Sequence, residues 1–430
     1  MLLSMEKKDY KIHIIGAGVS GLIAAKTLEQ HGYHPVIIEA TERVGGRVKT
    51  DIIEGYQLDH GFQVLLNAYP QAKKHLDYKA LNLQSFLPGA VIFSNQKQTT
   101  IGDPLRHLGL FFPTLFSSVG SISDKLKIFK LNKKLEKTSI EMIFSKPEQS
   151  TLNYLKDFGF SENIINQFFK PFFSGIFLEP NLKTSSRMFE FVYKMFGEGL
   201  AVLPKAGIGA ISEQLKSLLQ HTTFLFNRKV KQVHDTFIEL ENDEILDTHF
   251  TIIATSPQNL LPNLNHQNND WKSCYNLYFE TETRLINKPL IGLIADDDTL
   301  INNIFYHNSL SANSKGEKEL LSVTVVKDTD LNAENLVKKV EEELLKYCDI
   351  KILQHIKTYH IPNALPDIRD LQTDMFATET QIKATIFLAG DYLLNGSLNA
   401  AMLSGERAAE GVMESLEDGL VVEQLTSEYI

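Results

Sequence analysis

The amino-acid sequence predicts an α/β fold, in which a doubly wound parallel sheet is interrupted by an inserted α+β domain and a helical cap. The first observation is a βαβ unit, in which apolar strands at 11–15 and 36–38 flank a glycine turn and a compact helix. The second is that patterns of the same kind return near residues 200 and 385. The third is the different character of the long segments between them. Together these observations predict a Rossmann-type domain built from separate stretches of chain.

A chain of 430 residues is too long for one ordinary core, so two or three compact units are expected. Residues 67–197 are mostly helical in period and rich in Phe and Lys, which predicts a helical cap with few strands. Residues 271–364 contain several longer strands around one helix and form a mixed α/β region. The remaining stretches, 1–66, 198–270 and 365–430, make up the discontinuous Rossmann-type domain.

The individual elements follow in order from apolar periodicity and turn residues. In the first stretch, Glu54-Gly55 predicts a hairpin turn. In the cap, 125–141 has apolar residues along one side and predicts a single amphipathic helix. Further along, a glycine turn at 207–209 opens a helix that runs to about residue 219. The remaining predicted strands lie at 223–226, 229–234, 237–240, 250–254, 273–279, 290–295, 320–326 and 385–389, and the remaining helices at 333–347 and 397–416.

Composition and charge exclude several classes of protein. Hydrophobic residues make up 43% and charged residues 22%, which is typical of a globular rather than a disordered chain. The net charge is −10 and no basic block occurs, so no nucleic-acid partner is expected. The two cysteines, Cys274 and Cys348, lie far apart and form no CxxC pattern. We therefore expect no disulfide framework, no metal site and a cytoplasmic, reducing compartment.

Two segments bear on contact with membranes. Residues 1–11 are polar and charged and lack the apolar stretch of a signal peptide. The most apolar stretch, 105–120, is short, contains Arg106 and is broken by Pro113, so it is not expected to span a bilayer. Two interpretations stay open. The stretch forms the wall of a buried pocket, or it rests on a membrane surface and makes the protein peripheral.

The run Gly16-Ala17-Gly18-Val19-Ser20-Gly21 matches the pattern G-x-G-x-x-G. By itself this pattern is weak, but here it follows a predicted strand and opens a predicted helix. The first glycine permits the tight turn, the second lets the backbone approach a pyrophosphate, and the third lets helix and strand pack closely. The amides of Val19 and Ser20 then present the positive end of the helix to phosphates. The run predicts a dinucleotide site.

Glu39 lies 18 residues after Gly21, at the end of the second strand. A carboxylate in this position can accept hydrogen bonds from both ribose hydroxyls of a dinucleotide, each contributing roughly 1.5–3 kcal/mol. It would also repel a 2′-phosphate, which disfavours NADP. The alternative is a surface acid that merely caps the strand end.

The run after Glu39 decides between FAD and NAD, because it adds a second glycine pair and two arginines: Ala40, Arg43, Gly45, Gly46 and Arg47. A simple NAD domain has no need of these residues. The run resembles the second fingerprint of the flavin-containing amine oxidase and phytoene desaturase superfamily. That resemblance implies that Arg43 and the Gly45-Gly46-Arg47 turn bind FAD. It also implies that the discontinuous domain is the FAD-binding domain and that 271–364 holds the substrate.

Five further segments carry the same resemblance. They are Asp59-His60-Gly61-Phe62-Gln63, Leu203-Pro204-Lys205-Ala206-Gly207-Ile208-Gly209, Asn227-Arg228-Lys229-Val230, Thr251-Ile252-Ile253-Ala254-Thr255-Ser256-Pro257, and the closing run from Leu388-Ala389-Gly390-Asp391-Tyr392 to Ser404-Gly405. The first resembles the segment that passes the flavin ring, and the third the strand whose Val meets the adenine. In the closing run, Asp391 can bind ribitol hydroxyls, and the helix from about Ser397 points its amides at the edge of the flavin where negative charge develops.

The glycine turns, Glu39 and the closing run together predict one FAD site. No cysteine occurs at 390–404, so we expect FAD to be bound non-covalently. The predicted cofactor-binding residues are Gly16, Gly18, Val19, Ser20, Gly21, Glu39, Ala40, Arg43, Gly45, Gly46, Arg47, Gly61, Phe62, Val230, Ala254, Thr255, Gly390, Asp391, Ser397, Leu398 and Asn399.

The catalytic residues are less well defined, because hydride transfer to a flavin needs no general base. His60 lies in the segment expected beside the flavin and either handles a proton or is structural. Lys272 is the candidate, by position alone, for the lysine that many amine oxidases place near the flavin, although a surface lysine is the simpler interpretation. Tyr392 is one candidate for an aromatic residue that flanks an amine substrate.

Three functions remain open. The first is an amine oxidase-like enzyme that passes a hydride from a small-molecule substrate to FAD, with oxygen or a quinone as electron acceptor. The second is a phytoene desaturase-like dehydrogenase acting on C–C bonds of a lipophilic, isoprenoid substrate. It gains support if the aromatic residues of the cap line a cavity: Phe111, Phe112, Phe116, Phe168, Phe169, Phe172, Phe173 and Phe177. The third is a flavin-binding protein without turnover.

Overall fold

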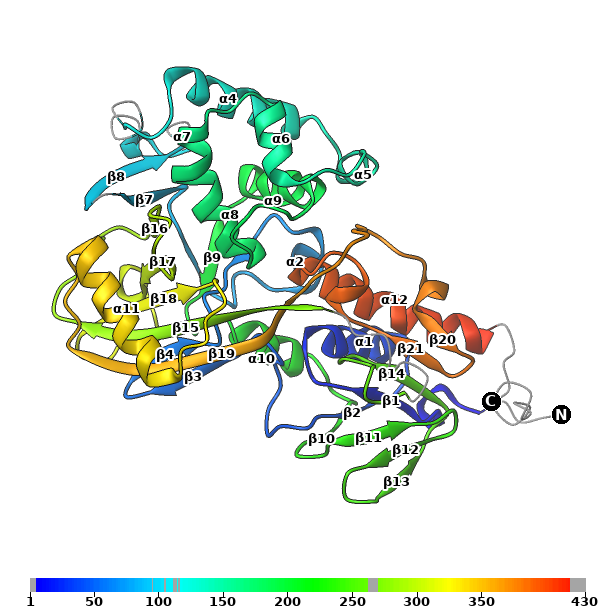
Figure 1. The fold of residues 1–430 in the computed structure, drawn as a ribbon. Helices are drawn as coiled ribbons and strands as arrows, with labels where there is room; N and C mark the ends of the chain where they lie inside the picture. Colours follow the sequence, from blue (N-terminus) through cyan, green and yellow to red (C-terminus); the bar gives the residue numbers. More distant parts are fainter. Residues whose placement is uncertain are drawn as a thin grey trace.

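A computed structural model provides the fold, and Figure 1 shows how its parts are arranged. The Rossmann-type stretches lie at the lower right of that view, the helical cap at the top, and a large sheet at the left. The residues that the structure describes are 5–94, 96–103, 106–110, 114, 117–261 and 270–417.

The predicted parallel sheet is present, and it has the strand order β10-β2-β1-β14-β21-β20. Every neighbouring pair is parallel except β20 with β21, which is antiparallel. Strands far apart in sequence are therefore adjacent in space, as the discontinuous arrangement requires. The strands are β1 (Ile12–Ile15), β2 (Val36–Ile38), β10 (Thr223–Leu225), β14 (Phe250–Ile253), β20 (Gln381–Lys383) and β21 (Ile386–Leu388).

The two faces of this sheet are covered by different layers. Because side chains alternate along a strand, Ile12 and Ile14 pack with the helical side, where α1 (Val19–Gln30), α10 (Ala210–Ser217) and α12 (Leu398–Glu417) lie. Ile15 faces the other side and packs with a three-stranded antiparallel sheet. That sheet consists of β11 (Val230–Val233), β12 (Phe237–Leu240) and β13 (Ile245–Asp247).

The second large sheet has seven strands in the order β19-β15-β18-β17-β16-β7-β8. Its helix α11 (Ala333–Cys348) buries Leu336, Val340 and Leu344 in a core formed with the sheet, on the outer side in Figure 1. The pairing of β16 with β7 is parallel and the others are antiparallel. The strands are β7 (Gly89–Ser94), β8 (Lys97–Gly102), β15 (Trp271–Thr281), β16 (Ile291–Ile294), β17 (Ile301–Tyr306), β18 (Glu319–Val325) and β19 (Gln354–Pro366).

The sequence interpretation was wrong for part of the 67–197 segment, which after one short helix at Pro70–His75 continues with strands and not with helices. β7 and β8 join the sheet of the 271–364 region, so they extend that region rather than the cap. An apolar run of six residues such as 89–94 does not distinguish a strand from a buried helix turn, and β8 is mostly polar. β17 and β19 were also missed. β19 has an exposed edge and lacks a clean alternation of apolar residues.

The cap itself is helical, as predicted. The predicted helix 125–141 is divided in two. The first helix ends at Glu136, and Ser139, three residues later, caps a second helix. The cap helices are α4 (Ile122–Glu136), α5 (Ile140–Phe144), α6 (Thr151–Asp157), α7 (Glu162–Ile164), the π-helical turn at Ile165–Phe169, α8 (Lys170–Phe177) and α9 (Ser186–Glu198). The remaining elements are α2 (Pro70–His75), the hairpin strands β3 (Thr50–Ile53) and β4 (Tyr56–Asp59), and the small sheet of β5 (Leu65–Leu66), β9 (Ala201–Pro204) and β6 (Leu83–Ser85).

Helices α1 and α12 lie side by side and approach each other closely at Gly405 (Figure 1). A Cβ atom on Gly405 would lie 2.2 Å from the carbonyl oxygen of Ser20, which is far inside van der Waals contact. A side chain here would therefore push apart the two helices that begin at the predicted FAD site.

We predict that Gly405→Ala lowers the free energy of unfolding by about 1–3 kcal/mol, as overpacking does elsewhere. Gly197→Ala is the matched control, because Gly197 also lies in a helix but nothing is within 4 Å of a Cβ placed there. That control should keep or slightly raise stability, since Ala is the better helix former. Thermal and urea unfolding of both variants measure the difference. Equal effects would mean that the α1–α12 contact is not tight.

Candidate active site

A cavity of about 1030 Å³ lies between the Rossmann-type stretches, the large sheet and the cap. Its wall includes the glycine turn at 16–18, the second glycine pair at 45–46, and the closing residues 390–392. The volume is at the top of the ~300–1,000 Å³ range of ligand pockets, which suits a ligand as large as a dinucleotide. The predicted site residues are therefore brought together from stretches that lie hundreds of residues apart.

The glycine turn has the geometry that a dinucleotide needs. Gly16 has a φ of +102° and donates its N–H to the carbonyl of Ile38 at 2.8 Å. A Cβ on Gly21 would lie 2.1 Å from the Gly16 oxygen, so helix α1 packs directly on the turn. Gly18 lines the cavity and has no atom within 4 Å of an added Cβ, which leaves open space above its backbone. Val19 and Ser20 line the cavity as well.

Glu39 is buried, with 8% of its surface exposed, and lines the cavity. Its Oε2 accepts the N–H of Ala17 at 2.8 Å, while Oε1 accepts the N–H of Thr41 at 2.9 Å and the Thr41 hydroxyl at 2.7 Å. These three bonds use most of the roughly four acceptor positions of a carboxylate and leave one for a ligand hydroxyl. Glu39 thus orders both glycine loops in addition to facing the cavity.

Arg47 connects the closing run to the large sheet. Its guanidinium donates to Asp391 Oδ1 at 2.5 Å and to the carbonyl of Ala364 at 3.1 Å, and it lies 5.3 Å from the centre of the Trp271 ring. The Asp391 side chain is only 5% exposed. All four residues line the cavity. A bound cofactor would therefore meet an arginine whose position is fixed from three directions.

Arg43 and Ala40 do not line the cavity. The Arg43 guanidinium donates to the carbonyl of Thr50 at 2.8 Å and pairs with Asp51. The sequence prediction that both residues contact FAD remains a prediction, but in this structure Arg43 contacts protein groups. Asp51 explains why Arg43 contacts protein groups, because the Asp51 carboxylate lies at the centre of a polar cluster with Arg43, His60 and Tyr359.

Helix α12 begins at the cavity. The Ser397 hydroxyl accepts the N–H of Ala400 at 3.0 Å and so caps the helix, and Ser397 and Leu398 line the cavity. Helix geometry leaves the amides of Leu398 and Asn399 without an intrahelical acceptor. The Asn399 side chain points elsewhere, since its Oδ1 accepts the N–H of Gln71 at 2.9 Å. Asn399 does not line the cavity, so its predicted contact with a cofactor depends on the backbone amide alone and remains a prediction.

The remaining predicted cofactor residues divide into two groups. Gly61, Phe62, Ala254, Thr255 and Gly390 line the cavity. Val230 does not, because it is buried in the core beneath β11 and β12. Its chain neighbour Arg228 donates its N–H to the Glu39 carbonyl at 3.0 Å, which places the start of this segment at the same end of the site.

His60 lines the cavity and is held by an acid. Its Nε2 lies 2.8 Å from Asp51 Oδ2, which also accepts the Tyr359 hydroxyl at 2.6 Å, and the His60 and Tyr359 rings are 4.6 Å apart. Burial acts to raise the pKa of Asp51, but hydrogen bonds from Tyr359, His60 and Arg43 outweigh it and hold that pKa below its usual value. An ionised Asp51 fixes the orientation of the His60 ring.

Lys272 does not line the cavity, so the structure disagrees with its placement as a catalytic residue. Its Nζ lies 3.3 Å from Asp367 Oδ1 and 3.5 Å from Thr184 Oγ1. The cavity side of β15 carries Trp271 and Cys274 instead. A shift in the register between β15 and β19 falls between Lys272 and Cys274, and simple alternation along the strand does not foresee it.

Tyr392 lines the cavity as expected, and its hydroxyl has no hydrogen-bond partner among the described residues. Burial raises the pKa of this phenol above its usual value, so it is neutral near pH 7. The ring also lies against Gly390, where a Cβ would be 2.2 Å from Tyr392 Cε1.

Sequence reasoning missed a row of neutral polar residues on the large sheet. Asn303 Nδ2 donates to Thr324 Oγ1 at 3.2 Å, and the Thr324 hydroxyl lies 3.2 Å from Asn276 Oδ1. Asn303 and Thr324 line the cavity, and Asn276 is fully buried behind them with its Nδ2 unpaired among the described residues. No motif marks these residues, because they come together only when β15, β17 and β18 pair.

The cap contributes an apolar wall. Of the aromatic residues predicted to face a cavity, Phe168, Phe172 and Phe173 line it, while Phe169 and Phe177 belong to the core. Phe111, Phe112 and Phe116 lie outside the described residues. Other apolar residues of the wall are Phe62, Phe86, Leu126, Ile128, Phe129, Ile176, Val192, Phe196 and Leu200.

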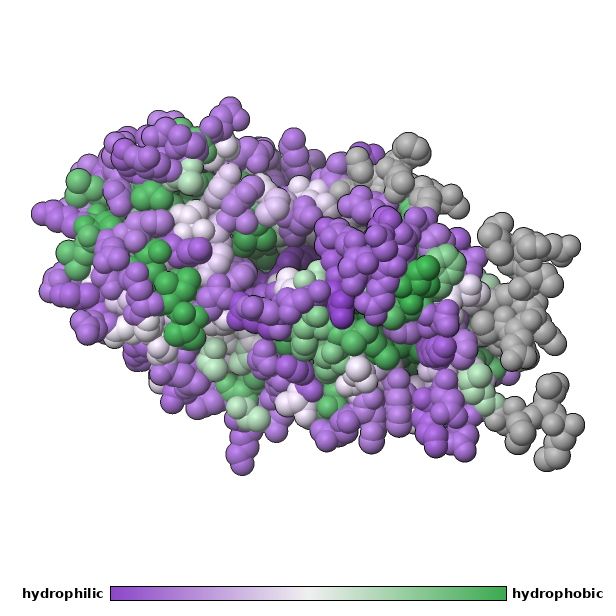
Figure 2. Space-filling model, turned by 90° about the horizontal axis from the view of Figure 1, so that it is seen from below, coloured by the Kyte–Doolittle hydropathy of each residue, from purple (hydrophilic) through white to green (hydrophobic). Residues whose placement is uncertain are grey.

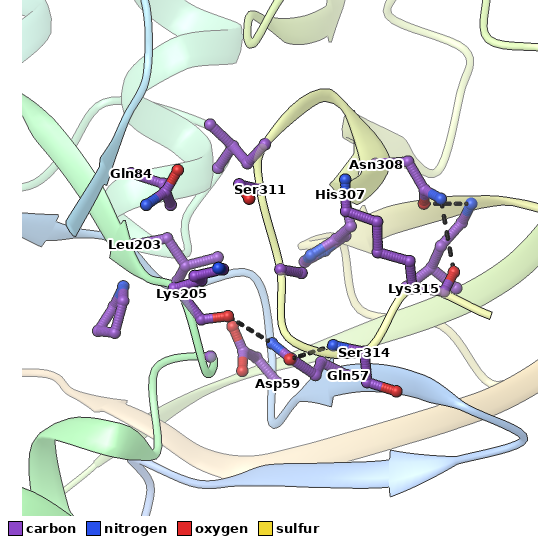
Figure 3. A pocket seen from close by; sticks show the side chains of 15 residues that line it. Gln57, Asp59, Gln84, Leu203, Lys205, His307, Asn308, Ser311, Ser314 and Lys315 are labelled. Carbon is purple, nitrogen blue, oxygen red and sulfur yellow. Dashed lines mark hydrogen bonds between the residues drawn. The ribbon is translucent and has the colours of Figure 1, made fainter. Parts of the chain in front are cut away.

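A second, small pocket of about 20 Å³ lies beside Asp59, with room for about one water molecule (Figure 3). Gln57 bridges it by donating to the Lys205 carbonyl at 3.1 Å and accepting the N–H of Ser314 at 2.8 Å. Asp59 Oδ1 accepts the Thr50 hydroxyl at 2.6 Å and the N–H of Ile208 at 3.0 Å. Burial outweighs these bonds and raises the pKa of Asp59 to about 7.

Comparison with known proteins decides which family this site represents. The family profile described as flavin containing amine oxidoreductase matches residues 19–413. The chain belongs to this family. Its members are FAD-dependent oxidoreductases, so the predicted resemblance, enzyme class and cofactor are confirmed. The open backbone above Gly18, the carboxylate of Glu39 and the start of α12 fit FAD, whose non-covalent attachment remains a prediction.

Similar sequences lie in several flavin enzymes. An L-amino-acid oxidase of Trimeresurus stejnegeri is 30% identical over 152 residues, which is 33% of this chain and 30% of that protein. Protoporphyrinogen oxidase 2 of Arabidopsis thaliana is 26% identical over 167 residues, which is 38% of this chain and 32% of that protein. The matched part thus amounts to about a third of each of these relatives.

Similar solved structures confirm the fold class. An oxidoreductase from Methanosarcina mazei has a TM-score of 0.72 at 16% identity and covers 94% of this chain and 100% of its own. Cyclohexylamine oxidase from Brevibacterium oxydans has a TM-score of 0.65 at 13% identity and covers 95% of this chain and 100% of its own. At these identities the likeness concerns the α/β fold with its FAD-binding and substrate parts, and not the substrate.

We predict that Glu39→Ala weakens FAD binding about tenfold or more, because a hydrogen-bonded carboxylate is lost and the two glycine loops lose their link. Titration of apoprotein with FAD measures this. Glu29→Ala is a matched control. Glu29 also accepts two backbone N–H groups, from Gln220 and His221, and the Thr222 hydroxyl, but it lies away from the cavity. Equal affinity in both variants would contradict the assignment of Glu39.

Asp59 should make stability depend on pH. Because its folded pKa of about 7 is above its unfolded value of 3.8, the folded state holds the proton more tightly, and stability falls as pH rises from about 4 to 7. Asp59→Asn keeps an acceptor for both hydrogen bonds. We predict that it removes up to about 4 kcal/mol of the pH-dependent change in the free energy of unfolding.

The test is urea unfolding of wild type and variant from about pH 2 to 8, with Asp124→Asn as the control of opposite sign in the acidic part of this range. Hydrogen bonds from Ser121 and Ser161 outweigh burial and lower the Asp124 pKa to about 2, so its contribution is present above pH 4 and is lost on acidification. A difference between wild type and Asp59→Asn that does not change with pH would show that Asp59 is ionised throughout.

Proposed function

We propose that this protein oxidises a C–H bond of a large, mostly apolar substrate. The observation that supports this most directly is the combination of apolar cap residues and neutral polar sheet residues in the wall of the same cavity as the FAD site. FAD, when bound, accepts a hydride from substrate carbon at its N5 atom. The protein's own groups bind and orient the substrate, exclude water and hold charges in place.

The apolar wall argues for a lipophilic substrate. The rings of Phe168 and Phe172 in the cap stack with their centres 5.5 Å apart, and the ring centres of Phe172 and Phe196 are 5.4 Å apart. Each aromatic side chain offers a large apolar surface, and burying apolar ligand area contributes about 25 cal/mol per Å². A small, charged amine gains little from such a wall and loses its hydration there.

The polar row on the sheet supplies a specific contact. Asn303 and Thr324 are 2% and 4% exposed, so only a group that enters the cavity can reach them. Both are neutral hydrogen-bonding groups, which suits a carbonyl or hydroxyl oxygen better than an ammonium or carboxylate. The proposed substrate is therefore a lipophilic compound with at least one neutral oxygen function.

The charged residues of the cavity wall near the FAD site are already paired with protein groups. Arg47 binds Asp391, and Glu39 binds backbone amides. Cys274 also lines the wall, and burial raises the pKa of its thiol to about 11, so it is a neutral group. His60, oriented by Asp51, is the wall residue best placed to exchange a proton, and we propose it in that role.

Oxidation of an amine is the second candidate. Trp271 and Tyr392 both line the cavity, and two aromatic faces can flank an amine substrate. The Arg47 guanidinium over the Trp271 ring counts against this, because it already occupies one of those faces and repels a second cation.

We predict that lipophilic enones, enols and polyenes bleach the flavin absorbance of the anaerobic holoenzyme, while primary amines and amino acids do not. The expected reason is the difference in desolvation between the two classes. Stopped-flow absorbance measures reduction, and oxygen consumption or quinone reduction then identifies the electron acceptor. Bleaching by amines alone would favour the second candidate. The absence of bleaching by any class would favour a flavin-binding protein without turnover.

Two variants sharpen this test. Phe172→Gln should raise the KM of a lipophilic substrate about tenfold while leaving FAD affinity unchanged, because it places an amide in the apolar wall. Lys272→Met should change kcat less than about threefold, because that side chain points away from the cavity and its ion pair is partly exposed. A large loss of kcat in Lys272→Met would contradict the site described above.

A further inference from the structure

We propose that the exposed face of α4 docks on the surface of an anionic lipid bilayer, so that the mouth of the cavity opens toward lipid. Three features of this helix support the proposal: an exposed apolar row, lysines beside that row, and continuity of the row with the cavity wall. Among the described residues no helix is long and apolar enough to cross a bilayer, and the proposal concerns contact with its surface only.

The apolar row consists of Ile122, Leu126 and Phe129, which are 73%, 66% and 46% exposed. Spacings of four and three residues place them on one face of the helix. The opposite face is anchored to the cap, where Leu131 and Leu135 are fully buried. Three neighbouring large apolar side chains left in water are unfavourable unless another surface covers them.

Lysines accompany the row. Segment 122–137 has six lysines and two acidic residues, although the whole chain has a net charge of −10. Helix periodicity places Lys130, Lys133 and Lys137 on the same side as the apolar row. Lys133 also lies 5.9 Å from the centre of the Phe129 ring. Apolar residues bordered by lysines are the pattern of a helix that lies in the interface of an anionic membrane.

The row is continuous with the cavity, because Leu126 and Phe129 line the cavity as well as being exposed, together with Ile128. A ligand in the cavity can therefore leave along apolar surface without crossing water. The view of Figure 2, taken from the side away from the cap, shows a surface that is mostly hydrophilic with scattered hydrophobic residues. A bilayer is the occupant that matches both the lysines and the lipophilic chamber.

The test uses the full-length, FAD-loaded protein and sedimentation with vesicles of phosphatidylcholine alone or mixed with phosphatidylglycerol. Binding is expected to the mixed vesicles, to weaken in high salt, and to be weaker without phosphatidylglycerol. The double variant Lys130→Glu/Lys137→Glu should bind at least about twenty-fold more weakly, since each lysine near an anionic surface contributes about fivefold. Ile122→Gln should weaken binding about tenfold, through the lost apolar contact.

Helix α11 provides matched controls. Leu345→Gln changes another exposed apolar residue, at 50%, and Lys338→Glu/Lys346→Glu reverses two exposed lysines. Both should bind like wild type, and retained flavin absorbance and melting temperature show that every variant is folded. Wild-type levels of binding by the α4 variants, equal losses in the controls, or a dimer that Ile122→Gln dissociates would each overturn the proposal. The docking proposal takes its purpose from the proposed function, but no substrate is present in the vesicle assay, so the two fail independently.

Discussion

The ion pair between Arg47 and Asp391 is the interaction on which the arrangement of the site depends. Asp391 follows the last strand of the parallel sheet, and Arg47 belongs to the loop after the second strand. The same guanidinium reaches Ala364 and Trp271 on the large sheet. Removing Arg47 would leave the Asp391 carboxylate, whose side chain is only 5% exposed, without its cationic partner. One side chain therefore links the two halves between which the cavity lies.

Around this pair, the polar and apolar requirements of the cavity are separated in space. Backbone amides of two helices and the carboxylate of Glu39 face the part that fits FAD. The part bounded by the cap is mostly apolar. Its polar lining residues include the neutral Asn303 and Thr324 on the sheet, and also Asp103, Arg106 and Lys125. A low-dielectric chamber beside a fixed charge pair strengthens electrostatic interactions and excludes water. The geometry thus favours chemistry on a carbon atom that is held in a dry environment.

How much of this the sequence could predict depends on the range of the interactions. The glycine turn, Glu39 and the start of α12 were predicted to line a dinucleotide site, because each is specified by a few neighbouring residues. Most of these residues line the cavity, whereas Gly21 and Asn399 do not. Lys272 could not be placed, since a register shift between β15 and β19 decides which residues face inward. Asn303 and Thr324 could not be predicted as neighbours from the sequence either. Their meeting depends on strand pairing across twenty residues, not on a local pattern.

The cap shows how a local pattern and its context can carry different information. The periodicity of 125–141 predicted an amphipathic helix, and the first part of this segment does lie in one, α4. A helical wheel alone, however, does not say which of its two apolar sides is buried. The structure shows Leu131 and Leu135 inside and Ile122 and Leu126 outside. The outward row borders the chamber that a lipophilic substrate would occupy. Docking on a bilayer would therefore explain both why these side chains are exposed and how the substrate enters. A substrate with low solubility in water reaches such a site most readily from the phase in which it is dissolved.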